Sequence, residues 1–329
     1  MKIAVLGAGA WGTALAISLS ASHQITLWAR DPNQLHDLVT QRVNRRYLPN
    51  LILPEALQLT AELELAVRTA ELILITIPIA GLRELLQQIK ALDKVSPVVL
   101  GCKGFEAQSS KLPHQVVREA YSTTAPCGIL SGPSFAQEVA QGLPTALTLA
   151  SDNDAFARHI TNEIHTAYLR IYSSNDMVGV ETGGAVKNVI AIATGISDGM
   201  SLGNNARAAL ITRGLAEITR MGVALGGCKE TFMGLAGIGD LILTCTGDLS
   251  RNRQVGMMLA KGQLLPEILH KIGHVAEGVH TAREVERIGQ RLKIEMPVTQ
   301  AVCSILYDSV PAEDVVKKIL DREPRTEFD

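Results

Sequence analysis

The sequence has neither an excess of charge nor a long apolar run. Its 329 residues carry 31 Lys and Arg against 33 Asp and Glu, so no global field favours nucleic acid or a membrane surface. The apolar runs, such as LILITIPIAGL at 72–82, are well short of the roughly 20 residues that a membrane-spanning helix needs. No signal-peptide pattern follows Met1. We therefore expect a cytoplasmic protein with no membrane span, in which a local site binds any anionic ligand.

Cysteines and histidines are few, and their spacing does not indicate a metal site. The five cysteines include no C-x-x-C pair and their number is odd, which favours free thiols in a reducing compartment. His270 and His274 have helical i,i+4 spacing, but Gly273 lies between them and no H-E-x-x-H frame surrounds them. We therefore expect no metal.

Short apolar runs alternate with helix-like segments in the first half of the chain. Most of the runs are continuously apolar, as expected for strands covered by helices on both faces. We predict strands at 2–6, 25–28, 72–77, 97–100, 128–130, 145–150 and 168–172. Farther on, the apolar positions recur at helical spacing, as in 205–222 and 279–292. The sequence thus predicts an α/β Rossmann-type, doubly wound, mostly parallel sheet at 1–180, followed by an all-α domain at 181–329.

Three glycines near the start predict a dinucleotide site. Gly7, Gly9 and Gly12 fit G-x-G-x-x-G between a predicted strand and an alanine-rich helix. Gly7 would allow a tight turn, Gly9 the approach of a pyrophosphate, and Gly12 close contact between helix and strand. The free N–H groups at the helix N-terminus would then bind the phosphates. A glycine-rich turn without a ligand is the alternative.

The end of the second predicted strand bears on the choice of cofactor. An NAD-preferring fold usually has Asp or Glu there to bond the ribose 2′-hydroxyl, whereas here Arg30 comes first and Asp31 follows. Because an arginine suits a 2′-phosphate, we expect NADP(H), alone or alongside NAD(H). A surface arginine paired with a carboxylate is the alternative.

Two loops after the fourth and fifth predicted strands should lie at the same sheet edge as the glycines. Lys103 stands between two glycines in GCKGFE, and SGPSFA at 131–136 offers the N–H of Gly132 and the hydroxyls of Ser131 and Ser134. In open α/β sheets, loops at the carboxyl ends of the strands line the ligand crevice. Either loop alone could be an ordinary turn, but two at one edge favour a ligand site.

Several polar residues interrupt segments of small and apolar residues in the second half of the chain. Lys187 and Asn188 lie in a helical segment where a lysine is costly unless it is paired or opens onto a cavity. Snorkelling to solvent is the alternative for Lys187. Farther on, Asp240 lies in a glycine-rich turn. We expect Ser250 to cap the next helix, so that Arg251 and the first N–H groups of that helix form an anion pocket.

These motifs together resemble those of one enzyme family. In chain order they are GAGAWGTALA, the KG pair at 103–104, GPSFA, KNVIAIATGISDG, NARAALITRGLAE, ETFMGLAGIGDLILTCTGDLSRNR and AEGV. The set is similar to the bacterial-type NAD(P)-dependent glycerol-3-phosphate dehydrogenases. The resemblance implies reversible reduction of dihydroxyacetone phosphate to sn-glycerol 3-phosphate by NADPH or NADH. It also implies a role in supplying glycerol phosphate for phospholipid synthesis.

The resemblance implies roles for single residues as well. Lys187 would be the general acid/base on the C2 oxygen, with Lys103 and Asp240 beside it as catalytic groups. The substrate would be bound by Lys103, Gly132, Ser134, Lys187, Asp240, Ser250, Arg251 and Asn252. The cofactor would be bound by Gly7, Gly9, Ala10, Trp11, Gly12, Arg30, Lys103, Ala136, Arg251, Val275 and Glu277. Burial or a nearby cation such as Lys103 would lower the pKa of Lys187 from its ordinary value of about 10.4.

Two other functions stay open at this point. A β-hydroxyacid dehydrogenase also joins a Rossmann domain to a helical domain in which a lysine is closely followed by an asparagine. A non-catalytic dinucleotide-binding sensor would leave Lys187 and the anion pocket without a use. Arg251, Asn252 and the turn at Asp240 favour glycerol phosphate over a carboxylate substrate. A homodimer is among the assemblies that the sequence allows.

Overall fold

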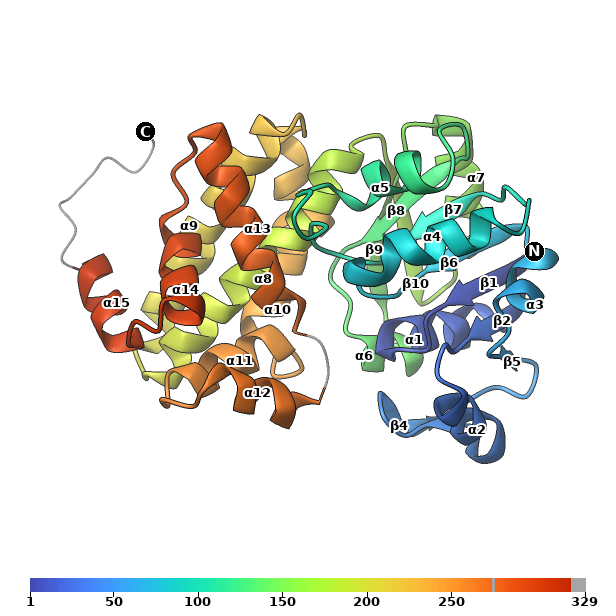
Figure 1. The fold of residues 1–329 in the computed structure, drawn as a ribbon, viewed down its shortest axis with the longest axis horizontal. Coiled ribbons are helices and arrows are strands. Elements are labelled where there is room, and N and C mark those ends of the chain that lie inside the picture. The colour runs from blue at the N-terminus through green and yellow to red at the C-terminus, as the bar shows by residue number, and fades with distance from the viewer. Residues whose placement is uncertain (274–275, 321–329) are drawn as a thin grey trace.

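The chain folds into a sheet-based half and a helical half (Figure 1). The structure is a computed structural model that describes residues 1–273 and 276–320. The main sheet is formed by β1 (Lys2–Leu6), β2 (Gln24–Trp28), β5 (Gln58–Thr60), β6 (Leu72–Ile75), β7 (Val98–Leu100), β8 (Cys127–Ser131), β9 (Thr145–Ala150) and β10 (Leu169–Ser174). Its strand order is β10-β9-β8-β7-β6-β1-β2-β5, and only β8 and β9 pair antiparallel. The predicted mostly parallel sheet is confirmed.

The seven predicted strands are all present, and their ends differ from the prediction by two residues at most. Three further strands were not predicted, namely β5 and a hairpin of β3 (Val43–Asn44) and β4 (Leu48–Ile52). The strands β3 and β5 are short, β4 is largely exposed, and no residue of β5 is fully buried. They therefore lack the continuous apolar run that identifies the buried strands.

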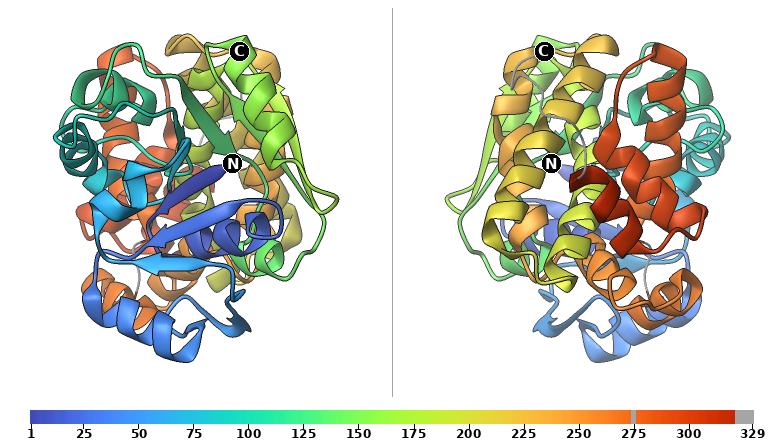
Figure 2. Two further views of the ribbon diagram at one scale, coloured as in Figure 1. Left: turned by 90° about the vertical axis from the view of Figure 1, so that its right-hand side faces the viewer. Right: turned by 90° about the vertical axis from the view of Figure 1, so that its left-hand side faces the viewer.

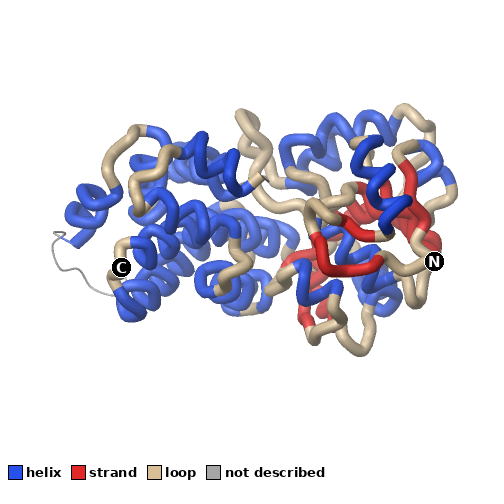
Figure 3. Tube along the Cα trace, turned by 90° about the horizontal axis from the view of Figure 1, so that it is seen from below, coloured by secondary structure: helices blue, strands red, loops and turns tan. Residues whose placement is uncertain are grey.

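Helices cover both faces of the sheet because successive strand side chains point in opposite directions. Ile3 and Val5 of β1 lie in a core with residues of α1 (Ala10–Leu19), α6 (Ala136–Ala140) and α7 (Asp154–Ile164). Ala4 and Leu6 lie in a second core with α3 (Leu63–Arg68), α4 (Leu82–Lys90) and α5 (Pro113–Ala120). Figure 3 shows strands only in this half of the molecule.

The helical half is built around one long buried helix, α8 (Met177–Gly199). Its residues are buried without a break from Gly179 to Ser197, as expected for a helix that is apolar nearly all round. The other helices there are α9 (Gly203–Ala224), α10 (Asp240–Thr246), α11 (Arg251–Leu259), α12 (Leu265–Ile272), α13 (Glu277–Leu292), α14 (Pro297–Tyr307) and α15 (Ala312–Leu320). Figure 2 shows this half end-on in its right-hand view. The predicted all-α second half is confirmed.

Glycines let α11 lie directly on α8. A Cβ at Gly195 of α8 would lie 2.0 Å from the carbonyl oxygen of Arg253, and a Cβ at Gly256 of α11 would lie 2.1 Å from that of Ile192. No side chain fits in either place, so the two backbones touch. This contact sets where the start of α11 lies relative to the middle of α8.

The helix α2 (Pro32–Gln41) and three short helical turns complete the described elements. The turns are η1 (Ile79–Gly81), η2 (Lys229–Met233) and η3 (Leu235–Gly239). Each helix in the described residues 1–273 and 276–320 is too short or too polar to span a bilayer.

Candidate functional site

The glycine loop between β1 and α1 has the geometry that a dinucleotide needs. Gly7 has a φ of +117°, which favours glycine, and a Cβ at Gly12 would lie 2.0 Å from the carbonyl oxygen of Gly7. Gly9 is the N-cap residue of α1, and a Cβ there would meet no atom of another segment within 4 Å. No side chain caps α1. The N–H groups of Ala10 and Trp11 in its first turn are therefore available to a phosphate, and the cradle fits the predicted pyrophosphate.

Arg30 and Asp31 follow shortly after the end of β2, and their side chains have different surroundings. The carboxylate of Asp31 accepts a hydrogen bond of 2.9 Å from the N–H of Asn33 and so caps α2 (Pro32–Gln41). The Arg30 side chain is exposed, and it pairs with no carboxylate of the described residues. This speaks against the alternative of a paired surface arginine.

Lys103, Lys187 and Asp240 come together from distant parts of the chain. Lys187 belongs to α8, Asp240 begins α10, and Lys103 follows β7. Asp240 is 1% exposed, and its carboxylate accepts a 2.7 Å bond from Lys103 Nζ and a close one from Lys187 Nζ. Lys187 is itself 6% exposed. It is therefore a paired, buried lysine, and the snorkelling alternative is wrong.

Thr244 is a member of this cluster that the sequence motifs did not single out. Lys187 Nζ donates a 2.8 Å hydrogen bond to Thr244 Oγ1, which in turn donates a 2.6 Å bond to the carbonyl oxygen of Asp240. Thr244 lies four residues after Asp240, which on a helix places both on one face. That spacing is the signal that could have identified it.

The surroundings of Lys187 favour its neutral form more than water does. Burial lowers the pKa of Lys187, Asp240 opposes this, and the positive charge of Lys103 adds to it, with the result that its pKa falls to about 7. For Asp240, burial would raise the pKa, but the two lysines outweigh burial and hold that pKa below its usual range. A lysine of this kind can exchange a proton near neutral pH.

The loop after β8 lies against α8 beside this cluster. A Cβ at Gly184 would lie 2.9 Å from Ser131 Oγ and 3.6 Å from Cδ of Lys103. Gly184 precedes Lys187 by one helical turn, so this loop and Lys103 meet the same part of α8. The φ of Gly132 is +142°, and Ser134 Oγ donates a 3.0 Å bond to the carbonyl oxygen of Gly132. Ala136 follows as the first residue of α6.

The start of α11 has the predicted cap. Ser250 is 4% exposed, and its Oγ accepts a 3.3 Å hydrogen bond from the N–H of Arg253. The Arg251 side chain is exposed. Asn252 is 9% exposed and accepts, through Oδ1, a 3.1 Å bond from the N–H of Gly278. This bond joins the start of α11 to the start of α13.

Glu277, the first residue of α13, feels the charges of the same site. Burial raises the pKa of Glu277, and the positive charges of Arg251, Lys103 and Lys187 act against this rise. The next residue, Gly278, donates its N–H to Asn252 Oδ1, and a Cβ at Gly278 would lie 2.7 Å from the carbonyl oxygen of Asn188. The start of α13 therefore lies against both α11 and the part of α8 next to Lys187. Val275 and His274, which the sequence analysis also singled out, lie outside the described residues.

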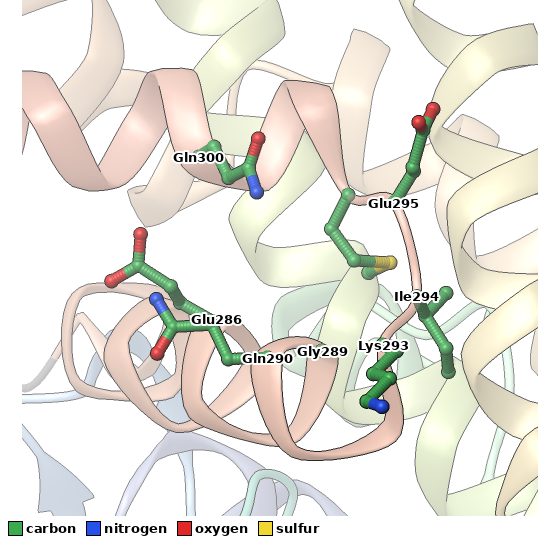
Figure 4. A pocket seen from close by; sticks show the side chains of 8 residues that line it. Glu286, Gly289, Gln290, Lys293, Ile294, Glu295 and Gln300 are labelled. Atoms are coloured by element: carbon green, nitrogen blue, oxygen red, sulfur yellow. The ribbon is translucent and has the colours of Figure 1, made fainter.

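Trp11 borders the site from the side of the glycine loop, because a Cβ at Gly101 would lie 2.9 Å from its indole Nε1. A separate pocket between the end of α13 and the start of α14 shares no residue with the site (Figure 4). Glu286, Lys293 and Met296 are among its lining residues. In the described parts of the chain, no three His, Cys, Asp or Glu side chains are grouped to bind a metal ion.

Comparison with known proteins gives a consistent result. The family described as NAD-dependent glycerol-3-phosphate dehydrogenase matches with its N-terminal part over residues 2–157 and its C-terminal part over residues 176–317. The glycerol-3-phosphate dehydrogenase [NAD(P)+] of Nitrosomonas eutropha is 66% identical over 329 residues, covering 100% of both chains. The enzyme of the same name from Nitrosomonas europaea is 64% identical over the same length, again covering 100% of both chains.

A solved structure agrees over nearly the whole chain. The glycerol-3-phosphate dehydrogenase of Coxiella burnetii is 42% identical, with a TM-score of 0.94 and coverage of 98% of this chain and 99% of that one. The resemblance seen in the motifs is thus confirmed on sequence and on fold. The chain belongs to the NAD(P)-dependent glycerol-3-phosphate dehydrogenase family.

Proposed function

We propose that this chain catalyses the NAD(P)H-dependent reduction of dihydroxyacetone phosphate to sn-glycerol 3-phosphate and its reverse. The observation that carries the proposal is the buried Lys187, which is held by Asp240 and Thr244 beside Lys103. The product would supply glycerol phosphate for phospholipid synthesis. The family of the chain and its relatives support the same reaction.

The bonds of Lys187 leave it one donor for the substrate. A lysine ammonium has three N–H donors. Two of them are directed to Asp240 Oδ1 and Thr244 Oγ1. The third is free to bond the C2 oxygen, so in the proposed reduction Lys187 polarises that oxygen and gives it a proton. When bound, NADPH or NADH supplies the hydride for the carbonyl carbon.

The phosphate of the substrate needs a positive local site, because the whole chain carries a net charge of −2. Arg251 and the first N–H groups of α11 offer such a site. A helix N-terminus attracts a phosphate dianion through its free N–H groups, and arginine binds phosphate with charged hydrogen bonds. Gly132, Ser134 and Asn252 would complete the substrate contacts.

The division of labour follows the two halves of the fold. We assign most of the cofactor binding to residues 1–180 and most of the substrate binding to residues 181–329. Lys103, Gly132 and Ser134 would contact the substrate from the first half, and the Lys103–Asp240 ion pair joins the two halves. A cytoplasmic location fits the five cysteines, which are all free thiols.

Lys187→Met should remove turnover and leave cofactor binding intact. Methionine keeps the length of the side chain but can neither donate a proton nor polarise the oxygen, so kcat should fall by at least about 10²- to 10⁴-fold. The assay follows the absorbance of NADPH on addition of dihydroxyacetone phosphate, and fluorescence titration gives the Kd of NADPH. Turnover by the variant within a few-fold of the unaltered protein would contradict the role of Lys187.

The same assay on the unaltered protein distinguishes the three functions. If dihydroxyacetone phosphate causes no loss of NADPH absorbance, the sensor is favoured. If a β-hydroxyacid is used with comparable efficiency, that dehydrogenase class is favoured.

The pH dependence should have opposite signs in the two directions. Oxidation of glycerol phosphate needs neutral Lys187 as a base, so kcat/KM should rise with pH through a limb that reflects its pKa of about 7. Reduction needs the protonated form, so its kcat/KM should fall with pH through the same limb.

Two variants test whether Lys187 is the origin of this limb. Asp240 raises and Lys103 lowers the pKa of Lys187. Asp240→Asn should therefore move the limb to lower pH and Lys103→Met to higher pH. Shifts in the same direction for both variants would rule out this origin of the limb.

Arg251→Ala should act through the substrate phosphate. We expect an increase in KM for dihydroxyacetone phosphate of about 10-fold or more, since charged hydrogen bonds contribute roughly 1.5–3 kcal/mol. At saturating NADPH, activity on unphosphorylated dihydroxyacetone should not change. Arg251→Lys serves as the matched variant that keeps the charge but loses the bidentate geometry. An equal loss on both substrates would argue against phosphate binding by Arg251.

Arg30→Asp should change the balance between the two cofactors. The substitution removes a cation that suits the 2′-phosphate and introduces a carboxylate that suits the 2′-hydroxyl. KM should rise much more for NADPH than for NADH, as measured by steady-state kinetics with each cofactor. Equal changes in the two KM values would remove Arg30 from this role.

A further inference from the structure

The carbonyl group of Ala8, inside the glycine loop, is held by two side-chain amides. Gln34 Nε2 donates to it at 2.6 Å and Asn44 Nδ2 at 3.0 Å. Gln34 lies on α2 and Asn44 in β3, a part of the chain that carries none of the motifs. Two donors on one backbone oxygen of a ligand loop call for an explanation.

The direction of that carbonyl fixes the direction of the next N–H. The Ala8–Gly9 peptide bond is trans, and in a trans peptide the C=O and the N–H point in opposite directions. Because the carbonyl points toward Gln34 and Asn44, the N–H of Gly9 points away from them. Within the described residues this N–H donates no hydrogen bond. It is therefore available on the side of the loop where Gly9 leaves space.

The neighbouring carbonyls of the loop are engaged in the same way. Thr76 Oγ1 lies 3.1 Å from the carbonyl oxygens of both Leu6 and Gly7, to which it can donate. The second N–H of the Asn44 amide donates to Thr13 Oγ1 at 2.8 Å, which ties the loop to the first turns of α1. The loop thus turns its carbonyls toward protein donors, and a phosphate approaching it does not face their negative ends.

We propose that Gln34 and Asn44 are positioning residues for the pyrophosphate of the cofactor. They hold the Ala8–Gly9 peptide in the one orientation that offers the Gly9 N–H to the ligand. Hydrogen bonds to a carbonyl also polarise its peptide, which makes the N–H on the same unit a stronger donor. The inference rests on the dinucleotide binding of the proposed function and adds residues outside the glycine motif to it.

The two side chains differ in how safely they can be changed. Asn44 is 2% exposed and joins three segments, so its loss would also reduce stability. Gln34 is half-buried on an outer helix, and methionine matches its length without a donor. Asn33, the exposed amide beside it on α2, provides the matched control.

The test is a set of binding titrations with Gln34→Met and Asn33→Met. Gln34→Met should weaken the Kd of NADPH and of NADH by about 3- to 10-fold each, the effect of one ordinary hydrogen bond. The Kd of 2′-AMP, which has no pyrophosphate, should not change, nor should kcat at saturating NADPH. Asn33→Met should bind all three ligands like the unaltered chain. Asn44→Ala should show the same selective loss, with its melting temperature measured alongside.

Equal NADPH binding by the Gln34→Met and Asn33→Met variants would overturn the inference. An equal loss for 2′-AMP would also overturn it, because the effect would then be a general disturbance of α2. If the unaltered chain bound neither NADPH nor NADH, the proposed function would fail as well. A failure of the inference alone is recognised by tight binding in the unaltered chain and in the variant.

Discussion

The structure of the site depends on one buried carboxylate, that of Asp240. A lone charge so deep in the protein would be costly, and the two lysine ammonium groups compensate it from opposite parts of the fold. Lys103 comes from the sheet half and Lys187 from the helical half, so the same carboxylate that orients the proton donor also joins the two halves. The chemistry and the relative placement of the halves therefore rest on the same ion pairs.

Thr244 shows how closely the local geometry follows from this constraint. The hydroxyl accepts from Lys187 and donates to the backbone of Asp240, so it closes a small ring of hydrogen bonds around the first turn of α10. With Thr244 in place, Lys187 is held away from solvent. Two of its three N–H donors are used, and the third is left for the substrate. Burial and the two neighbouring charges then determine how readily that donor gives up its proton.

Much of the fold could be predicted from the sequence, and the reason is burial. Strands such as β1 and β6, buried on both faces, show continuous apolar runs, whereas the half-exposed β5 and the β3–β4 hairpin show none. The Ser250 cap was equally predictable, because a cap is a local pattern. By contrast, Gln34 and Asn44 act on Ala8 through contacts between segments far apart in the chain. Composition and spacing along one segment contain no record of such contacts.

The glycine contact between α8 and α11 has a consequence for substrate choice. Lys187 and Arg251 are carried by two helices whose backbones touch at Gly195 and Gly256, without an intervening side chain. The main-chain contact therefore sets the distance between the backbone positions that carry the proton donor and the proposed phosphate site. In the proposed reaction, substituting a single side chain of the protein would not make room for a substrate with one more carbon between its carbonyl and its phosphate. Selection of a three-carbon backbone would thus be a property of how two helices cross.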